Sequence, residues 1–293
     1  MGTELDSRGV DTHDPLWSAL ALTTAPEAVR QVHTDYLKAG ARVITTNTYQ
    51  ATLPALLRAG HDAHRAREVI AAGARLAGEA ARRFEAEHPE AQVLIAGGLG
   101  PYGAYLADGS EYTGVYDVGA LDAPVFRDVH LPRIEMLAGE GIDLFALETL
   151  PRLDEAQALV GAVEDLAAES ECWVSFQVRP DGAHLADGTP LAEAASWAAD
   201  QETVVAVGVN CVAPDVVARA LPVLREATTK PLVAYPNSGD LYDPATKTWK
   251  AGEEGDGLAA LAPSWGASGV RLIGGCCRTR PAQIRELAHA LSA

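Results

Sequence analysis

The chain has 293 residues, and its 23 lysines and arginines against 40 aspartates and glutamates give a formal net charge of −17 at pH 7. Such an acidic surface repels phosphate groups and anionic lipid headgroups, so we expect binding neither to nucleic acid nor to membranes. Hydrophobic residues make up 48% of the chain, enough for a large buried core. No apolar run approaches the ~18 residues of a membrane span, and the opening MGTELDSRG carries charges where a signal peptide is apolar. We therefore expect a cytoplasmic protein whose four cysteines stay reduced.

Short apolar runs alternate with amphipathic stretches along the whole chain. The runs predict parallel strands buried on both faces, because they are continuous rather than alternating. These strands are expected at 42–48, 92–97, 142–148, 172–178, 204–210, 231–235 and 270–275. Helical patterns follow them at 62–87, 124–139, 153–168, 191–199, 214–227, 256–265 and 280–291, and another, at 26–39, precedes the first strand. Gly40, Gly141 and Gly269 stand just before strands, where a helix end needs a left-handed residue.

The repeated strand–helix units predict an α/β fold with a parallel sheet. They fit a (β/α)8 TIM-type barrel that lacks its first strand in this chain, with residues 1–293 forming a single domain. The opening MGTELDSRG then corresponds to the loop after the absent strand. A doubly wound open sheet is the alternative, but no G-x-G-x-x-G motif follows an early strand. In a barrel, the long connections 99–123 and 236–255 lie at the carboxyl ends of strands, where active sites are built.

Three of the four cysteines also follow predicted strands. Cys211 comes directly after VVAVGVN, and the adjacent Cys276 and Cys277 come after VRLIGG. Neighbouring side chains on a strand point to opposite faces, so this pair shares one ligand only if the backbone turns, a freedom that Gly274-Gly275 supplies. Soft thiolates select zinc, and three protein ligands leave a fourth tetrahedral position open. Spacing alone supports a zinc site and a set of core or redox thiols about equally, whereas Cys172 is interpreted as a buried apolar thiol.

Two of these segments, GVNC (208–211) and GGCCRT (274–279), resemble the zinc-binding signature of homocysteine S-methyltransferases. The resemblance extends to the branch that uses S-methylmethionine or S-adenosylmethionine as donor, through DPLWSA (14–19), TTNTYQA (45–51), GPYGAYLADGSEYTG (100–114), ETLP (148–151) and YPNSGDLYDPATKTW (235–249). It covers essentially the whole chain. It implies a (β/α)8 barrel, Zn²⁺ held by Cys211, Cys276 and Cys277, and homocysteine bound to zinc through sulfur.

The resemblance further implies methyl transfer from a sulfonium donor to homocysteine, which forms methionine. A free thiol has a pKa near 8.5 and is a poor nucleophile at neutral pH, whereas coordination to zinc deprotonates it. The sulfonium sulfur leaves as a neutral thioether without an acid catalyst. We therefore expect small-molecule partners and no catalytic residue beyond the zinc site. The protein then has to supply an in-line pose and a pocket that accepts a cation.

Polar residues at the strand ends are the candidate substrate contacts. Glu148 ends a predicted strand, and the resemblance assigns it to the α-ammonium group of homocysteine; capping of the next helix is the alternative. Asn210 adjoins a cysteine and either hydrogen-bonds near the substrate or forms a turn. Asn47 and Thr48 end another strand at the same mouth. Leu147 departs from the family, which often has cysteine before the glutamate.

Aromatic residues of the two long loops are weaker candidates for the donor pocket, since aromatic faces attract cations. Packing is the alternative for all of them: Tyr102, Tyr105, Tyr112, Tyr116, Tyr242 and Trp249. The segment Asn237-Ser238-Gly239 is either a site loop or a turn, and none of the eight histidines is expected to bind metal.

Family members usually begin with a strand followed by Asp-Gly-Gly, which helps to hold homocysteine. Here Met1 stands where that motif should continue, so we expect a start codon assigned too late or, as the second choice, a natural truncation. Truncation would favour a zinc-binding barrel with weak or no activity. A third hypothesis is a methyltransferase acting on another thiol or selenol acceptor. The sequence pattern leaves the preferred donor and the oligomeric state open.

Overall fold

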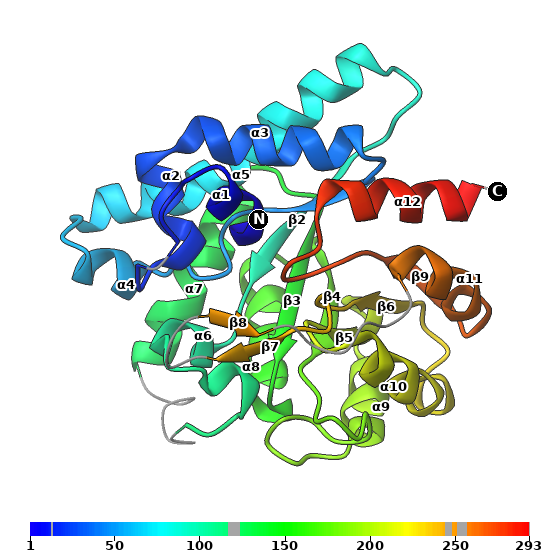
Figure 1. The fold of residues 1–293 in the computed structure, drawn as a ribbon. Coiled ribbons are helices and arrows are strands. Elements are labelled where there is room, and N and C mark those ends of the chain that lie inside the picture. The colour runs from blue at the N-terminus through cyan, green and yellow to red at the C-terminus, as the bar shows by residue number, and fades with distance from the viewer. Residues whose placement is uncertain (13, 117–123, 244–247, 251–256, 293) are drawn as a thin grey trace.

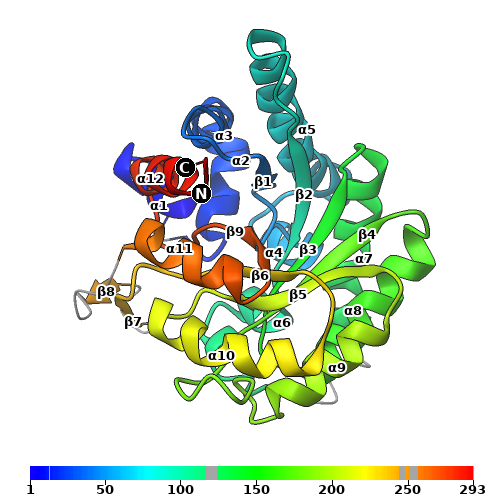
Figure 2. The same cartoon turned by 90° about the vertical axis from the view of Figure 1, so that its right-hand side faces the viewer.

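A curled parallel sheet wrapped by helices forms the centre of the computed structural model, which describes residues 1–12, 14–116, 124–243, 248–250 and 257–292 (Figures 1 and 2). The seven strands pair in the order β1 (Val43–Thr45), β2 (Leu94–Leu99), β3 (Leu144–Leu150), β4 (Glu171–Phe176), β5 (Val204–Asn210), β6 (Leu232–Tyr235) and β9 (Val270–Ile273). Consecutive strands are neighbours in this sheet, as in a TIM-type barrel. The expected α/β barrel architecture is confirmed, and the doubly wound alternative is wrong.

The sheet does not close on itself within the described residues. β1 and β9 are its two ends, and no described strand pairs with both of them. This gap lies where the sequence pattern places the absent first strand. In Figure 2, β1 and β9 lie near each other, on the side of the molecule that carries the N- and C-terminal segments.

The principal helices lie outside the sheet, at the positions that the amphipathic pattern predicts. They are α3 (Pro26–Lys38), α5 (Ala63–Glu87), α7 (Pro124–Gly139), α8 (Leu153–Leu166), α9 (Leu191–Asp200), α10 (Pro214–Ala227), α11 (Leu258–Ala267) and α12 (Pro281–Ser292). Gly40, Gly141 and Gly269 have φ angles of 108°, 73° and 96°, which confirms the left-handed helix ends. No helix in the described part of the chain is both long and apolar enough to span a bilayer.

The N-terminal segment is helical rather than the predicted loop. α1 (Gly2–Ser7) buries Leu5 completely, and it is followed by η1 (Trp17–Leu20) and α2 (Ala21–Thr24). Leu5 belongs to an apolar cluster with Leu16, Val29 and Val32, so burial against α3 stabilises a segment whose own pattern is too short to predict a helix.

Short elements also occur inside the predicted loops. They are α4 (Leu53–Arg58), α6 (Tyr102–Leu106), η2 (Ser110–Tyr112) and a hairpin of β7 (Leu241–Asp243) with β8 (Thr248–Lys250). Each has six residues or fewer, which is below the length at which periodicity identifies an element.

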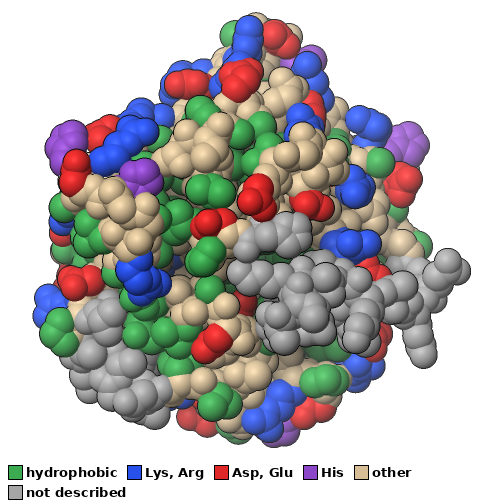
Figure 3. Space-filling model, turned by 60° about the vertical axis from the view of Figure 1, so that its left-hand side comes forward, with side chains coloured by type: hydrophobic (Ala, Val, Ile, Leu, Met, Phe, Trp, Pro, Cys, Tyr) green, Lys and Arg blue, Asp and Glu red, His purple; other side chains and the backbone are tan. Residues whose placement is uncertain are grey.

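The largest apolar cluster packs the sheet against its outer helices, mainly α7 to α10. A smaller cluster, which includes Ala96, Ala146, Trp173 and Val233, fills the inner face of the strands. The strands pack closely there, because a Cβ atom on Gly208 would lie 1.7 Å from the Val233 carbonyl oxygen. On the face shown in Figure 3, acidic, basic and hydrophobic side chains lie among one another.

Candidate active site

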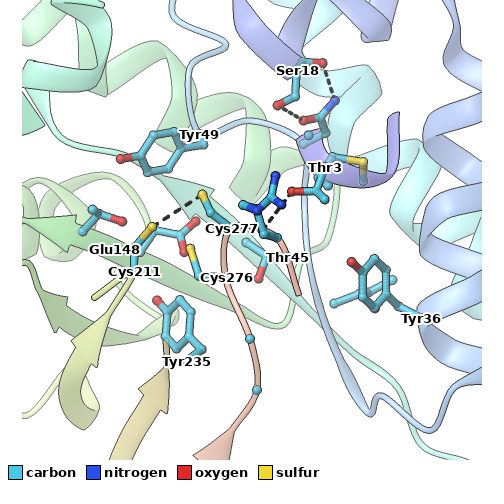
Figure 4. A pocket seen from close by; sticks show the side chains of 18 of the residues that line it. Thr3, Ser18, Tyr36, Thr45, Tyr49, Glu148, Cys211, Tyr235, Cys276 and Cys277 are labelled. Atoms are coloured by element: carbon cyan, nitrogen blue, oxygen red, sulfur yellow. Dashed lines mark hydrogen bonds between the residues drawn. The ribbon is translucent and has the colours of Figure 1, made fainter. Parts of the chain in front are cut away.

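A cavity of about 850 Å³ opens at the carboxyl ends of the strands. Its walls include residues at the carboxyl ends of four strands: Asn47 after β1, Glu148 within the last residues of β3, Cys211 after β5, and Cys276 and Cys277 after β9. The cavity also extends between β1 and β9, where the sheet is open. The mouth of the barrel is therefore the candidate active site, as the sequence predicts (Figure 4).

Backbone turns bring the three cysteines to this mouth. Cys211 has a φ of 54° and donates its amide to the Tyr235 carbonyl at 3.0 Å, while the Cys276 amide donates to the Pro236 carbonyl at 2.7 Å. Arg278, directly after Cys277, has a φ of 63°. The expected freedom at Gly274-Gly275 is thus not where the chain turns into the left-handed region. Gly275 is needed for space instead, since its Cβ would lie 2.2 Å from the Thr279 methyl group.

The three sulfur atoms lie close enough together to share one metal ion. All are within 4.8 Å of one another, and Cys211 Sγ is 3.5 Å from Cys277 Sγ. Tetrahedral zinc with Zn–S bonds of ~2.3 Å requires sulfur–sulfur distances of about 3.8 Å, so small side-chain adjustments suffice. Among the described residues, this is the one group of metal-ligand side chains with such spacing. Cys172 lies apart, buried within β4, as its interpretation as a core thiol requires.

Hydrogen bonding within the cluster favours negative charge on one sulfur. Cys211 donates to Cys277, which lowers the pKa of Cys277 well below the usual thiol value, and Cys276 contributes in the same direction. The pKa of Cys211 is raised well above that value, because it hydrogen-bonds to Cys276 and Cys277 and is buried. The geometry therefore accommodates thiolate, and a bound cation would offset the accumulated charge.

Glu148 lies beside the sulfur atoms in Figure 4. It is buried within β3, which continues to Leu150, whereas α8 begins at Leu153. The helix-cap alternative is therefore wrong. Burial raises the pKa of Glu148 to about 8, the nearby Cys276 raises it as well, and a hydrogen bond with Tyr235 lowers it.

Asn210 is fully buried and makes its hydrogen bonds inside the protein. Its Oδ1 accepts from the Thr149 amide and the Ser175 hydroxyl, each at 2.8 Å, and its Nδ2 donates to Thr149 Oγ1 at 2.8 Å. Ser175 Oγ lies 2.6 Å from the Tyr235 hydroxyl, and that hydroxyl accepts a hydrogen bond from Trp173 Nε1 at 3.0 Å. Asn210 thus connects β3, β4 and β5 directly before Cys211, and it does not line the cavity.

Asn47 and Thr48 are also bonded to the protein itself. The Asn47 amide accepts from Ser18 Oγ and donates to the Ser18 carbonyl, both at 2.8 Å, which holds η1 at the cavity wall. The Thr48 hydroxyl donates to the Gly98 carbonyl at 2.8 Å and lies behind the wall rather than along it.

The loop tyrosines divide into two groups. Tyr112 lines the cavity, with its hydroxyl 4.0 Å from Cys211 Sγ. Tyr102, Tyr105 and Tyr116 pack with Phe126 beneath the loop, so the packing alternative describes them. The side chains of Tyr242 and Trp249 lie outside the described part of the structure.

The segment Asn237-Ser238-Gly239 is a turn that holds the cysteine backbone. Asn237 Oδ1 accepts from the Gly239 amide at 2.9 Å, and its Nδ2 donates to the Cys211 carbonyl at 3.1 Å. The Ser238 amide donates to the Cys277 carbonyl at 3.1 Å. The turn and site-loop interpretations therefore apply together.

Several cavity residues were not singled out as site candidates from the sequence, among them Trp17, Glu111, Thr149 and Tyr235. All four lie in segments on which the family resemblance rests. The signal was present, but it did not show which members of each segment face the cavity.

Comparison with known proteins agrees with this geometry. The family model described as homocysteine S-methyltransferase matches residues 1–291. A homocysteine S-methyltransferase of Escherichia coli is 46% identical over 291 residues, which are 98% of this chain and 92% of the relative. A selenocysteine methyltransferase of Astragalus bisulcatus is 37% identical over 308 residues and covers 100% of this chain and 90% of the relative.

The metallated form of the E. coli homocysteine methyltransferase MmuM superposes with a TM-score of 0.87 at 42% identity, over 99% of this chain and 93% of that one. A family model over nearly the whole chain, a closely similar fold and three converging cysteines lead to one conclusion. The chain belongs to the homocysteine S-methyltransferase family and is an enzyme of that family.

Proposed function

We propose that this enzyme moves a methyl group from S-methylmethionine or S-adenosylmethionine to the sulfur of homocysteine, forming methionine, with Zn²⁺ held by Cys211, Cys276 and Cys277. The observation that carries the proposal is the convergence of three thiol sulfurs, within 4.8 Å of one another, on a cavity of about 850 Å³. The donor set fits zinc because thiolates are its preferred ligands and the cavity offers an open fourth position. When bound, zinc supplies the positive charge that keeps the homocysteine thiol deprotonated at neutral pH.

The chain's own residues bind and orient the substrate. Glu148 is the proposed partner of the homocysteine α-ammonium group, because it is a buried carboxylate beside the sulfur cluster. A bound cation repays the cost of burying that carboxylate. Asn210 is proposed to position Cys211, since its hydrogen bonds with Thr149 and Ser175 hold the backbone directly before that cysteine. Asn47 holds η1 in the same way, and Thr48 supports the adjoining wall.

The transfer itself needs little further chemistry from the protein. The thiolate electron pair of homocysteine forms the new sulfur–carbon bond, and the carbon–sulfonium bond breaks toward the donor sulfur. That sulfur leaves as a neutral thioether, so no proton has to be supplied to it. The contribution of the cavity is to hold the two sulfurs in line with the methyl carbon.

The cysteine trio also bears on where the enzyme works. Oxidation of Cys211 or Cys277 to a disulfide would remove metal ligands, so we propose a reducing, cytoplasmic setting. Methionine formation there places the enzyme in methionine biosynthesis, with small molecules as its partners.

The test combines metal analysis with turnover. The purified chain is expected to contain about one zinc ion per chain and to form methionine from homocysteine with at least one of the two sulfonium donors. Cys276→Ala is expected to lose both zinc and activity, whereas Cys172→Ala, which alters a cysteine outside the cluster, keeps both. Zinc retained by Cys276→Ala would contradict the ligand assignment. A zinc-loaded chain that forms no methionine with either donor is the outcome expected of a barrel without methyltransferase activity.

A second acceptor is favoured by one finding, the 37% identity to a selenocysteine methyltransferase over 308 residues. A selenol would take the open position on a zinc ion held by the same three cysteines, and its selenolate would accept a methyl group by the same displacement. Parallel assays with homocysteine and selenocysteine at equal donor concentration separate the two acceptors by kcat/KM. If kcat/KM is higher for selenocysteine, selenocysteine replaces homocysteine as the proposed acceptor.

A further inference from the structure

Glu111 is a cavity residue that the zinc site and the proposed homocysteine contact leave unexplained. It belongs to η2, in the loop that follows β2, and it lines the same cavity as the cysteines. Its Oε2 atom is buried and has no hydrogen-bond partner among the described residues. A buried carboxylate oxygen without a partner is costly, so its presence at a cavity wall calls for a ligand.

The loop holds Glu111 in a defined place. A Cβ atom on Gly103 would lie 2.5 Å from the Glu111 amide nitrogen, so α6 and η2 pack directly against each other. Asp108 Oδ1 accepts from the Ser110 amide at 3.0 Å, and the Gly109 φ of 88° sets the turn before η2. The carboxylate is therefore positioned by packed backbone rather than carried on a free loop.

Glu111 lies close enough to Tyr49 and Tyr112 for its charge to act on both side chains, and the charge of Cys211 acts on the same two. The next residue, Tyr112, places its hydroxyl 4.0 Å from Cys211 Sγ. Burial raises the pKa of the Tyr49 hydroxyl well above its usual value, and the nearby charges of Glu111 and then Cys211 raise it further. Tyr49 thus lies within the electrostatic range of both groups, and its ring contacts Trp17 edge to face at 6.3 Å between centroids.

No described basic side chain forms an ion pair with Glu111. The four arginines on the cavity wall have other partners. Arg278 pairs with Asp240, and Arg280 lies 3.5 Å from Glu4. Arg42 and Arg271 donate to backbone carbonyls close to them in the chain. Burial raises the pKa of Glu111 to about 7, a hydrogen bond from its own backbone amide lowers it, and the nearby Asp108 carboxylate raises it. Aromatic rings and an uncompensated carboxylate together favour a cationic ligand.

We propose that Glu111, with the rings of Tyr49 and Trp17, binds the positive charge of the methyl donor and so selects a sulfonium compound over the corresponding neutral thioether. This inference rests on the proposed function, because Glu148 is taken by the α-ammonium group of homocysteine. The donor is the one reactant whose sulfur loses its positive charge during the transfer. A carboxylate at this place therefore binds the donor before the transfer and releases the neutral product sulfur after it.

The test compares Glu111→Gln with the wild-type enzyme and with Glu169→Gln, a matched change at an exposed position. Calorimetric titration of the zinc-loaded enzyme with S-methylmethionine, and separately with methionine, measures binding of the charged and neutral forms without turnover. Glu111→Gln is expected to weaken S-methylmethionine binding 10- to 100-fold and to leave methionine binding within about twofold. In turnover, the donor KM rises by the same factor, while zinc content and the homocysteine KM stay unchanged.

Unchanged S-methylmethionine affinity in a folded, zinc-loaded Glu111→Gln variant would overturn the proposal. A rise in the homocysteine KM alone would do so too, because Glu111 would then belong to the acceptor site. If Glu111→Gln does not fold, Glu111→Asp keeps the charge one methylene farther back and is expected to weaken S-methylmethionine binding less than 10-fold. Affinities of Glu111→Asp for S-methylmethionine and methionine that both equal those of the wild type would contradict the inference. Failure of the proposed function is distinguishable, since it abolishes methionine formation in the wild type while the binding titrations still report on Glu111.

Discussion

Two clusters of charged or titratable side chains lie at the carboxyl end of the barrel, and they differ in whether other protein groups satisfy them. The first, the ionic cluster, consists of Arg133, His130 and Glu155. The fully buried Arg133 guanidinium donates to the carbonyls of Val129, Tyr49 and Gly100 at 2.9–3.0 Å. Glu155 accepts from the Tyr102 amide at 2.5 Å and lies 3.4 Å from His130 Nε2. Positive and negative groups offset each other inside the protein.

The second, the sulfur cluster, consists of Cys211, Cys276, Cys277 and Glu148. Its groups open into the cavity, where hydrogen bonds favour thiolate at Cys277 and burial raises the pKa of Glu148 to about 8. The comparison teaches that the two clusters serve different ends. A polar cluster whose groups are bonded to one another inside the protein supports the fold, whereas one that opens into a cavity is completed by ligands.

The largest expected effect comes from breaking the ionic cluster. Glu155→Gln removes a carboxylate whose nearby charge favours the charged form of the buried Arg133, and it is expected to lower the free energy of unfolding by about 4 kcal/mol. Urea unfolding measures this change, with the exposed Glu169→Gln as the control, whose stability should stay within ~0.5 kcal/mol of the wild type. A loss below ~1 kcal/mol for Glu155→Gln would show that the ionic cluster is not structural.

A somewhat smaller loss of unfolding free energy is expected when Asn210, which holds the backbone directly before Cys211, is replaced. Asn210→Ala removes three hydrogen bonds and leaves the Thr149 amide and the Ser175 hydroxyl without their buried acceptor. The expected cost is about 3 kcal/mol of unfolding free energy. Chemical denaturation checks it, and zinc titration of the folded variant should show weaker binding because Cys211 follows directly. Unaltered stability and zinc affinity would mean that Asn210 only fills space.

The buried His33, which belongs to neither cluster, is expected to make the stability of the protein depend on pH. Burial lowers the pKa of His33 to about 3, below the ordinary value of 6.5. The folded protein therefore resists protonation that the unfolded chain accepts, so stability present above pH 6.5 is lost as the pH falls toward 3. One such histidine accounts for about 2 kcal/mol between pH 8 and pH 5.

Unfolding free energies of wild type and His33→Gln at pH 8 and pH 5 measure that contribution. The variant is expected to lose about 2 kcal/mol less than the wild type over this interval. Equal losses in the two proteins would show that His33 is protonated in the folded state.

The smallest effect on the metal-free fold is expected from the sulfur cluster itself. In zinc-free buffer, Cys277→Ser should change the unfolding free energy by less than about 1 kcal/mol, because the native fold does not depend on completing this cluster. Zinc at 100 to 1,000 times its dissociation constant should stabilise the wild type by about 3–4 kcal/mol and leave the variant unaffected. Thermal unfolding with and without zinc provides both values. A metal-free variant that unfolds as easily as Glu155→Gln would remove the distinction between the clusters.

Much of the fold could be read from the sequence because long, repeated patterns report on it. The continuous apolar runs identified all seven strands of the main sheet, and β5 begins and ends where predicted, at 204–210. The amphipathic stretches likewise identified the eight principal helices. Short elements such as α1 were missed, since a six-residue helix is stabilised by tertiary burial of Leu5 rather than by its own sequence.

The sequence by itself also determined the reactive end of the molecule, because cysteines that follow parallel strands meet at one edge whatever the details of packing. Cys211, Cys276 and Cys277 were identified in this way, and the structure brings their sulfurs together. Only the tertiary structure decided which polar side chains face the cavity. Asn210 and Thr48 turn into the protein, where neighbouring strands offer hydrogen-bond partners, while Glu111 is left with a buried oxygen that has none. The orientation of these side chains depends on hydrogen-bond partners that are distant in the chain, and local sequence patterns do not reveal those partners.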